Sequence, residues 1–376
     1  MAWSVTRHDV IKRLLTDPRL SKNPRTSWPA WIRGEIPADW PLISWVAVES
    51  MFTADGPEHT RLRSLVSKAF TPRRIAALAD PIQAIVDRLL DDLATTAAGT
   101  VVDLRARFAY PLPTTLICDL FGVPGTDRPE VCRVIDAVLD TAATPAQAQA
   151  NAHDLYAAMH QLIATKRAQG GDDLTTALIA AQDQDSRLTE TELVSTLILM
   201  IGAGSETTVN LISSAVAALL SHPDQLQLLL TGQVGVDQIV EETLRHHAPI
   251  MHLPLHYATA DIDLDGALIR QGDPVLIGYG AAGRDPDLHG ENTDVFDPGR
   301  PSTEHLAFGH GPHFCMGAPL ARLEADIALR SLFSRFPDLT LAVPADQLRP
   351  QASFIANGHQ ELPAMLHGGQ PTPLAA

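Results

Sequence analysis

The chain has 376 residues, of which 45% are hydrophobic and 19% are charged, so it can form a globular protein with a substantial core. Its formal net charge of −16 argues against the generally basic surface of a nucleic-acid-binding protein. Its three cysteines, Cys118, Cys132 and Cys315, are too few for a disulfide framework and indicate a reducing compartment.

The sequence contains no recognisable targeting or membrane segment. Residues 1–15 lack the long apolar core and the small-residue cleavage site of a signal peptide. The most apolar stretch, residues 193–204, is too short to span a bilayer, and Glu206 follows it closely. We therefore expect a cytoplasmic protein with no membrane anchor and no nucleic-acid partner.

In chain order, the first half begins with a Pro-rich segment, residues 24–41, which is predicted as a surface loop. Apolar side chains then recur every three or four residues, which predicts helices over 75–94, 152–168 and 189–222. The last of these begins with a capping box, because Glu192 follows Thr189 at the required spacing, and it ends before Pro223. A helix this long and this apolar is expected to run through the middle of the protein.

The second half changes in character. It predicts, in order, a helix over 237–248, strands over 261–266 and 273–280, a polar Pro/Gly-rich loop over 283–301 and a helix over 318–336. Pro319 lies in the first turn of the last helix, where its missing N–H costs little. We find no repeat and no low-complexity linker, so we predict a single domain over 1–376, mainly α with a small β region.

Residues 308–317 read FGHGPHFCMG and surround Cys315 with three glycines. Glycine is used where φ is positive or where another group must approach the backbone closely. A helix is predicted to start just after Cys315, and the partial positive charge at its N-terminus favours a thiolate. These features fit a thiolate ligand loop, a glycine turn around a buried thiol, or a zinc site formed by His310, His313 and Cys315. No second cluster of zinc-ligand residues with partner spacing follows in the sequence.

The same segment resembles the haem-ligand loop of the cytochrome P450 family, whose pattern is F-G-x-G-x-H-x-C-x-G. Every specified position is present: Phe308, Gly309, Gly311, His313, Cys315 and Gly317. The resemblance implies the cytochrome P450 fold, in which a long central helix lies over a haem (heme b, iron protoporphyrin IX). It also implies that the Cys315 thiolate is the axial ligand of the iron and pushes electron density towards it.

The predicted central helix contains the sequence AGSETT, in which Glu206 and Thr207 stand in an otherwise apolar stretch. Unaided, the pair could be a surface glutamate beside a threonine that bonds to the carbonyl four residues earlier. The cost of burying a carboxylate and of having Gly202 and Gly204 in one helical turn favours a functional site instead. The segment resembles the family's oxygen-binding motif, A-G-x-[DE]-T, which implies catalytic roles: Thr207 contacts dioxygen and Glu206 relays protons. It also implies that Ala203 and Gly204 leave room over the cofactor.

The source of electrons is expected to be another protein. The GAG at 202–204 is half of a dinucleotide fingerprint, but it lies inside a predicted helix and the third glycine is missing. In the bacterial P450 enzymes that the chain resembles, the donor is a ferredoxin with its reductase. Five basic residues near the proximal motifs would attract such an acidic partner: Arg61, Lys68, Arg73, Arg74 and Arg322.

A third motif is EETLR, in which Glu242 and Arg245 are three residues apart on one helix face. An exposed pair of this kind is worth well under about 1 kcal/mol and would be ordinary. The family has E-x-x-R here, closed by an arginine from a later loop, and FDPGR supplies Arg300 in that place. The resemblance implies a structural triad that holds the loop presenting Cys315.

A fourth motif, DGPEHTRLR, places His59 and Arg63 four residues apart on one helix face. Without the resemblance they would be a solvated basic face; with it they are implied to bind the haem propionates, as is His313. The chain departs from the family at His256, where an arginine usually contacts a propionate, and at Gly283, where asparagine is common. Its N-terminus also starts later than is usual in the family.

The resemblance implies a haem-thiolate monooxygenase, expected to be a monomer, that inserts one atom of O2 into a bulky apolar molecule such as a steroid, a macrolide or another natural product. The substrate pocket is expected to be lined by residues 40–52, by Leu199 and Ala203, and by Pro249 to Leu253. Two alternatives remain open: a haem-thiolate enzyme that couples or desaturates its substrate, and a haem binder or sensor. The Glu206–Thr207 pair argues against the sensor, because binding alone needs no proton relay.

Overall fold

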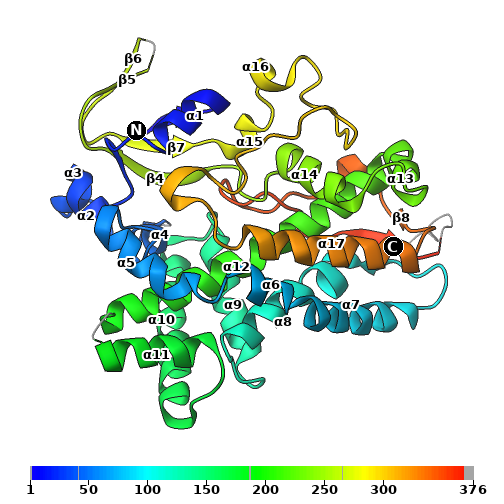
Figure 1. Ribbon diagram of the computed structural model, residues 1–376, viewed down its shortest axis with the longest axis horizontal. Coiled ribbons are helices and arrows are strands. Elements are labelled where there is room, and N and C mark those ends of the chain that lie inside the picture. Colours follow the sequence, from blue (N-terminus) through cyan, green and yellow to red (C-terminus); the bar gives the residue numbers. More distant parts are fainter. Residues whose placement is uncertain (1, 41, 186–187, 265, 368–376) are drawn as a thin grey trace.

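The computed structural model, described over residues 2–40, 42–185, 188–264 and 266–367, consists mainly of helices (Figure 1). The helices in chain order are α1 His8–Leu14, α2 Pro24–Ser27, α3 Pro29–Ile32, α4 Ile43–Ala47, α5 Gly56–Ser67, α6 Pro72–Ala76, α7 Ala79–Ala94, the π-helix η1 Arg105–Ala109, α8 Pro111–Leu120, α9 Arg128–Leu139, α10 Pro145–Gln169, α11 Leu174–Asp185, α12 Glu190–Ser221, α13 Pro223–Leu230, α14 Val236–His246, α15 Tyr279–Ala282, α16 Pro286–His289, the 3-10 helix η2 Gly311–His313, α17 Ala318–Arg335 and the 3-10 helix η3 Ala345–Gln347. The predicted fold class, mainly α with a small β region, is confirmed.

The helix α12 has 32 residues and crosses the middle of the molecule, as the sequence predicts (Figure 1). Its capping box is present: Thr189 Oγ1 accepts from Glu192 N at 3.1 Å, and Glu192 Oε2 accepts from Thr189 N at 2.8 Å. The first half of α12 packs into a core shared with α8, α9, α10 and α11, and the second half into a core shared with α7, α14 and α17. Residues 202–208 belong to neither core, so packing fixes both halves of the helix and leaves this middle turn between them.

In the described part of the chain, three small sheets make up the β region. The largest has the strand order β1-β7-β4-β2, with β1 Trp3–Val5, β7 Pro274–Ile277, β4 Leu253–Ala258 and β2 Leu20–Ser21. The second has the order β3-β9-β8, with β3 Val102–Asp103, β9 Pro363–Met365 and β8 Thr340–Leu341, and the third pairs β5 Ile262–Leu264 with β6 Ala267–Ile269. Only β1 and β7 pair in parallel among these described strands, and the register of β4 on β7 shifts between Leu253 and His256.

The prediction of a surface loop over 24–41 is wrong for residues 24–32 and agrees with the structure over 33–40, which are non-helical and mostly exposed; residue 41 lies outside the described residues. Its prolines begin two short helices instead of interrupting them, because Pro24 and Pro29 occupy first-turn positions. Asn23 Oδ1 caps the first of these helices by accepting from Arg25 N at 3.0 Å. The ring of Trp28 stacks on the buried ring of Tyr257, with 5.2 Å between centroids, so the segment is tied to β4.

The other element predictions differ mainly at their boundaries. The helix predicted over 75–94 begins at Ala79, because Ala77 N donates to Arg73 O and Leu78 N to Ile75 O, which closes α6 first. The helix predicted over 152–168 begins earlier, at Pro145, where Thr144 provides a capping box. The predicted strand 273–280 ends at Ile277, and the predicted loop 283–301 contains α16; residue 265 of the predicted strand 261–266 lies outside the described residues.

Within the described residues, none of the helices combines the length and the apolar character needed to cross a bilayer. The long apolar helix α12 instead buries its side chains against neighbouring helices.

Candidate active site

An internal cavity of about 350 Å³ lies between the middle turn of α12 and the loop before α17. Every residue that was predicted individually to bind the cofactor or the substrate lines it: His59, Arg63, Leu199, Ala203, Gly204, Pro249, Leu253, His256, Phe308, Gly309, His313, Cys315 and Gly317. The predicted ranges line it only in part, because 40–52 contributes Trp45, Val48, Met51 and Phe52, and 249–253 contributes Pro249, Ile250 and Leu253. Of the two predicted catalytic residues, Thr207 lines the cavity, whereas Glu206 is not part of its wall. The fold therefore brings residues from three separate motifs, and from the segment 249–256, to one space.

The loop that carries Cys315 depends on two glycines. Gly309 and Gly311 have φ values of +72° and +70°, a conformation that L side chains rarely adopt. A Cβ atom on Gly311 would also lie 2.9 Å from the carbonyl oxygen of Leu15, so this glycine permits a close approach as well. The loop is closed by a hydrogen bond from Cys315 N to the carbonyl oxygen of Phe308 at 2.8 Å. Both predicted reasons for the glycines, positive φ and close approach, are confirmed.

The sulfur of Cys315 opens onto the cavity, and α17 begins shortly after it at Ala318. Burial raises the pKa of the Cys315 thiol, and hydrogen bonds from the backbone N–H groups of Gly317 and Ala318 oppose this only in part. The backbone at the helix N-terminus therefore favours a thiolate, as expected, but desolvation of the thiol outweighs it. A coordinated metal ion would deprotonate the thiol outright.

The zinc hypothesis has no support in the structure. Across the four described stretches of the chain, no set of three His, Cys, Asp or Glu side chains is placed to hold a metal ion. A single sulfur facing an apolar cavity instead fits a metal that brings its own in-plane ligands, as the iron of a haem does.

One wall of the cavity gathers buried polar side chains that lack partners. His59 and His256 are 5% and 3% exposed, and neither His59 Nε2 nor His256 Nδ1 has a hydrogen-bond partner. The ring of His313 lies 4.2 Å from that of His59, and Arg63 Nη2 donates to the carbonyl oxygen of Phe314 at 2.6 Å. Buried polar atoms are normally hydrogen-bonded, so these unpartnered atoms fit a polar group of a ligand, such as the propionates of a haem. The residues present therefore fit the cofactor that the loop pattern implies.

In the middle of α12, Thr207 lines the cavity but also makes a local hydrogen bond. Its Oγ1 donates to the carbonyl oxygen of Ala203 at 2.7 Å, which is the bond of the purely structural alternative. The hydroxyl oxygen keeps a lone pair for a second partner in the cavity. Gly204 lines the cavity and has a second reason to lack a side chain, because a Cβ atom there would lie 2.5 Å from Cδ1 of Ile117. The missing side chain thus admits α8 as well as leaving room for a cofactor.

Glu206 is turned into the protein. It is 3% exposed, and its Oε1 accepts hydrogen bonds from Arg105 Nη2 at 2.5 Å and from Gln351 Nε2. Its Oε2 has no hydrogen-bond partner, although it is buried. The sequence analysis missed Arg105 and Gln351, because no local pattern connects residues so far apart in the chain. A buried carboxylate with one free oxygen can take a second partner without first breaking its ion pair.

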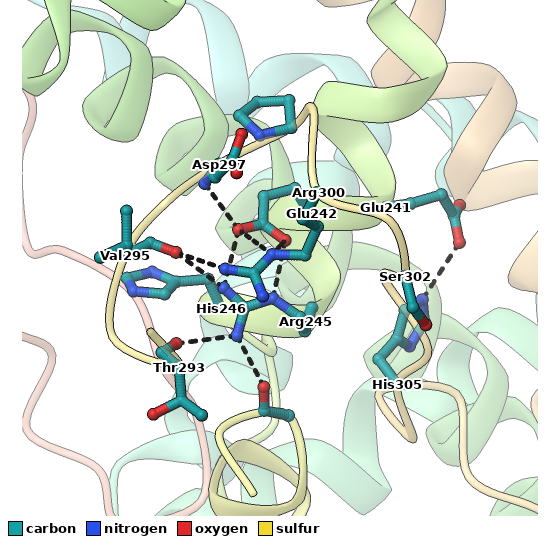
Figure 2. Close-up of polar contacts among 12 residues, drawn as sticks. Glu241, Glu242, Arg245, His246, Thr293, Val295, Asp297, Arg300, Ser302 and His305 are labelled. Carbon is teal, nitrogen blue, oxygen red and sulfur yellow. Dashed lines mark hydrogen bonds and ion pairs between the residues drawn. The ribbon is translucent and has the colours of Figure 1, made fainter. Parts of the chain in front are cut away.

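Figure 2 shows the triad predicted from EETLR and FDPGR, in which Glu242 and Arg245 are fully buried and the side chain of Arg300 is nearly so. Arg245 donates from Nε to Glu242 Oε2 and from Nη2 to Glu242 Oε1, both at 2.7 Å. Arg300 Nε donates to Glu242 Oε1 at 3.1 Å, and Asp297 N donates to the same oxygen at 2.8 Å. The pair is therefore a buried, saturated cluster and not the exposed pair that spacing alone would suggest.

The same cluster explains the second departure from the family pattern. Arg245 Nη1 donates to the carbonyl oxygens of Gly283 (2.8 Å) and Thr293 (2.9 Å), and Nη2 donates to Val295 O at 3.0 Å. A Cβ atom on Gly283 would collide with the carbonyl oxygen of Arg245. Glycine at this position lets the two backbones meet, so the guanidinium can bind three carbonyl groups of the chain that leads to Cys315.

The predicted basic surface is less charged than the sequence suggests. Arg322 donates to Glu241 Oε1 from Nε at 2.5 Å, and Arg61 pairs with Glu192. Each of these two arginines is thus partly neutralised. Lys68, Arg73 and Arg74 have no ion pair with other described residues.

The remaining wall of the cavity is apolar. It includes Trp45, Val48, Met51 and Phe52 from the segment 40–52, together with Ile135 and Val138 of α9, Ile198 of α12 and Ile250. Trp45 Nε1 donates to the carbonyl oxygen of Val138 at 3.1 Å, so the segment around α4 is joined to α9. The chemistry of this wall suits an apolar ligand larger than a few atoms.

Comparison with known proteins agrees with this geometry. A family model described as Cytochrome P450 matches residues 142–230 and 236–353. The chain is 46% identical to 2-hydroxy-5-methyl-1-naphthoate 7-hydroxylase from Streptomyces carzinostaticus, over 98% of this chain and 90% of the relative. It is 39% identical to 6-deoxyerythronolide B hydroxylase from Saccharopolyspora erythraea, over 98% of this chain and 91% of the relative.

The fold comparison gives the same result. The structure of CYP154A1 from Streptomyces coelicolor A3(2) superposes with a TM-score of 0.94 and 53% sequence identity, and the match covers 97% of this chain and 92% of that one. The placement of the thiolate loop, the middle turn of α12 and the buried triad therefore occurs within a fold shared with such enzymes. The chain belongs to the cytochrome P450 family and is a P450 monooxygenase, an enzyme whose haem is bound through a cysteine thiolate.

Proposed function

We propose that this P450 monooxygenase hydroxylates a bulky apolar natural product, such as a steroid or a macrolide, with electrons supplied one at a time by a ferredoxin. The observation that carries the substrate class is the apolar wall opposite the polar one, from Trp45 to Val138. Relatives of the chain are named as hydroxylases of a naphthoate, of 6-deoxyerythronolide B and of vitamin D(3), which supports a large, mostly apolar substrate.

The cofactor is proposed to be heme b, held by Cys315 through its iron and by His59, Arg63, His256 and His313 through its propionates. When bound, the haem supplies the activation of O2 and the transfer of one oxygen atom to carbon. The positions of the protein groups support this orientation, because the unpartnered His59 Nε2 and His256 Nδ1 lie on the same polar wall.

The protein's own part in the chemistry is to bind the substrate and to deliver protons. The apolar wall would exclude water and hold the substrate beside Ala203 and Thr207. Thr207 would offer its hydroxyl to the cavity, either through its free lone pair or by leaving the carbonyl of Ala203. Glu206 would supply protons from the far side of this turn, through the oxygen that Arg105 does not bind.

The redox partner is proposed to dock over the positive charge of Lys68, Arg73 and Arg74, with smaller contributions from the paired Arg61 and Arg322. An acidic ferredoxin would be attracted to this region although the whole chain carries a charge of −16. Replacing Lys68, Arg73 and Arg74 together by glutamate should slow reduction and leave the ferric spectrum unchanged. An unchanged reduction rate would contradict this docking site.

We also propose a monomeric, single-domain, cytoplasmic enzyme.

The proposed reaction is tested in two steps. Titration of the holoenzyme with a panel of steroids, macrolides and polyketides, followed through the Soret band, should identify a ligand that displaces water from the iron. Turnover of that ligand under isotopically labelled O2 should then give a product that carries one labelled oxygen atom. A coupled or desaturated product without the label would overturn hydroxylation, and saturable binding without any turnover would favour a haem sensor.

A further inference from the structure

Lys22 is a buried lysine that the motifs do not explain. It follows β2 directly, is 4% exposed and lines the cavity. Its Nζ lies 3.7 Å from the centroid of the Phe52 ring, and within the described residues it forms no hydrogen bond or ion pair. Burying an ammonium group without a counter-charge costs about several kcal/mol of folding free energy. A cation in this position therefore indicates a negative group that enters the cavity.

The nearest carboxylate is already engaged elsewhere. Asp55 Oδ2 accepts from Ser21 Oγ at 2.5 Å and from the backbone N of Lys22 at 3.1 Å, and its Oδ1 lies 3.7 Å from His313 Nε2. Burial lowers the pKa of Lys22 to about 7, and the attraction of Asp55 offsets only part of that effect. Asp55 thus fixes the backbone at Lys22 but forms no ion pair with its ammonium group.

A count of charges on the polar wall shows what is missing. The two propionates of a haem carry two negative charges, and Arg63 supplies one permanent cation. His256 stands where the family has an arginine, but burial lowers its pKa well below the ordinary value, and burial followed by Arg63 lowers that of His59. The charge of Lys22 acts directly on both of these imidazoles, so it lies in the same cluster.

We propose that Lys22 binds a haem propionate and supplies the cation that the arginine-to-histidine difference at position 256 removes. The inference rests on the haem site described above and adds a ligand contact, from the residue that follows β2, that no motif of the sequence analysis contains. A carboxylate on the substrate is the other possible partner, but the groups around Lys22 are those of the propionate wall, His59, His256 and Asp55. Lys22 would place the cation directly after β2, whereas an arginine at position 256 would place it on β4. These two strands are paired, so the two positions lie on neighbouring parts of one sheet.

The test measures haem retention in the ferric holoenzyme, by transfer of haem to an excess of apomyoglobin. Lys22→Met should lose haem roughly 10- to 100-fold faster than the unmodified protein, the range expected for one charged hydrogen bond. Lys22→Gln, which keeps the polarity and much of the length, should behave similarly and guards against a folding defect of the first variant. Lys12→Met, at a partly exposed lysine that does not line the cavity, is the matched control and should leave the transfer rate unchanged.

A charge-relocation variant makes the test specific. In Lys22→Met/His256→Arg the cation returns to position 256, and haem transfer should slow again towards the original rate. The reduction potential of Lys22→Met should also become more negative, because a positive charge near the ferric iron is removed. Equal transfer rates in the unmodified protein, Lys22→Met and Lys22→Gln would overturn the proposal. Unchanged haem loss combined with weaker binding of acidic ligands would overturn it too, and would assign Lys22 to a substrate carboxylate.

The failure of this inference can be told apart from failure of the proposed function. The carbon monoxide difference spectrum of the reduced enzyme reports thiolate ligation by Cys315, and it should keep its red-shifted peak in every variant that still holds haem. If the unmodified protein lacks that peak, the haem-thiolate site itself is wrong. If the peak is present and Lys22 has no effect on haem transfer, only the role of Lys22 is wrong.

Discussion

Two buried guanidinium–carboxylate clusters differ in how completely their polar atoms are paired. The first, called here the proximal cluster, is the triad of Glu242, Arg245 and Arg300 beside the Cys315 loop. Both oxygens of Glu242 accept hydrogen bonds in it, and Arg245 binds three backbone carbonyl groups in addition. The second, the distal cluster, is the pair of Glu206 and Arg105 behind the middle turn of α12. The two side chains form an ion pair at 2.5 Å, but Glu206 Oε2 and Arg105 Nε are buried without a hydrogen-bond partner among the described residues. Natural proteins rarely leave such atoms unpaired, so the difference calls for an explanation.

The difference teaches what each cluster can do. A saturated cluster has one low-energy arrangement, and it therefore fixes the backbone that leads to Cys315. An incompletely paired cluster can exchange partners at little cost, which is what a group that passes protons requires. Glu206 is adjacent in sequence to Thr207, which lines the cavity, whereas neither Glu242 nor Arg245 is part of the cavity wall. The complete pairing of the proximal cluster thus suits a structural role, and the incomplete pairing of the distal cluster suits a dynamic one.

The largest expected effect is on the proximal cluster. In Glu242→Gln, two buried guanidinium groups lose their shared counter-charge, because Arg245 and Arg300 both pair with Glu242. We expect the free energy of unfolding of the holoenzyme to fall by about 3–5 kcal/mol, the usual cost of breaking a buried pair from one side. Urea unfolding followed through the Soret band and through far-UV circular dichroism measures it. A loss below about 1 kcal/mol would show that the cluster is not the structural centre described.

The second effect, on the distal cluster, should separate stability from turnover. Glu206→Gln keeps the shape of the side chain and its contact with Arg105, so we expect a loss of stability of only about 1–3 kcal/mol. Product formation should fall by roughly 100-fold or more if the carboxylate delivers protons, the range found for positioned acids and bases. The measurement is the rate of product formation in H2O and D2O beside the urea midpoint. Product formation within two-fold of the original, with the same solvent isotope effect, would contradict the proton-relay role.

A third change, in a partly exposed ion pair, gives a reference value for the loss of unfolding free energy at the two buried clusters. Arg322 and Glu241 form a partly exposed pair, and Arg322→Gln should cost about 0–1 kcal/mol because solvent screens the charges. Burial opposes ionisation of Glu241, but hydrogen bonds from Arg322 and His305 outweigh it and lower its pKa to about 2. Since the folded-state pKa lies below the ordinary value of 4.5, the pair stabilises the fold above that value, and this contribution is lost as the pH falls towards 2. Acid titration of the urea midpoint should therefore be less steep in Arg322→Gln, and an identical slope would contradict the assignment.

These contrasts also show what the sequence could predict. The pairing of Glu242 with Arg245 follows from their spacing on a helix, and the resemblance to the P450 family adds Arg300, but nothing local indicates that the pair is fully buried. Arg105 was missed because its contact with Glu206 joins residues 101 positions apart, which only the fold brings together. Lys22 was missed for the same reason.

Local signals were read more reliably than long-range ones. The capping box at Thr189, the positive φ of Gly309 and Gly311, and the proline in the first turn of α17 are set by neighbouring residues and are confirmed. The break between α6 and α7 was missed because Ile75 continues the apolar spacing across it while the backbone turns. The short helices α2 and α3 were missed because prolines were taken to exclude helix where they begin it.

The smallest expected effect on stability belongs to Thr207, and it decides whether the distal turn is functional. The hydrogen bond from Thr207 Oγ1 to Ala203 O is internal to the helix, so Thr207→Ala should change the free energy of unfolding by no more than about 0.5 kcal/mol. The haem should be retained, yet reducing equivalents should be diverted from product to hydrogen peroxide, because the cavity loses the hydroxyl that is proposed to contact O2. Thr207→Ser is the matched control, since it restores a hydroxyl at the same position and should recover most of the product yield. An equal ratio of product to peroxide in all three proteins would mean that the hydroxyl serves only the helix, and the contrast between a structural proximal cluster and a functional distal turn would then rest on Glu206 alone.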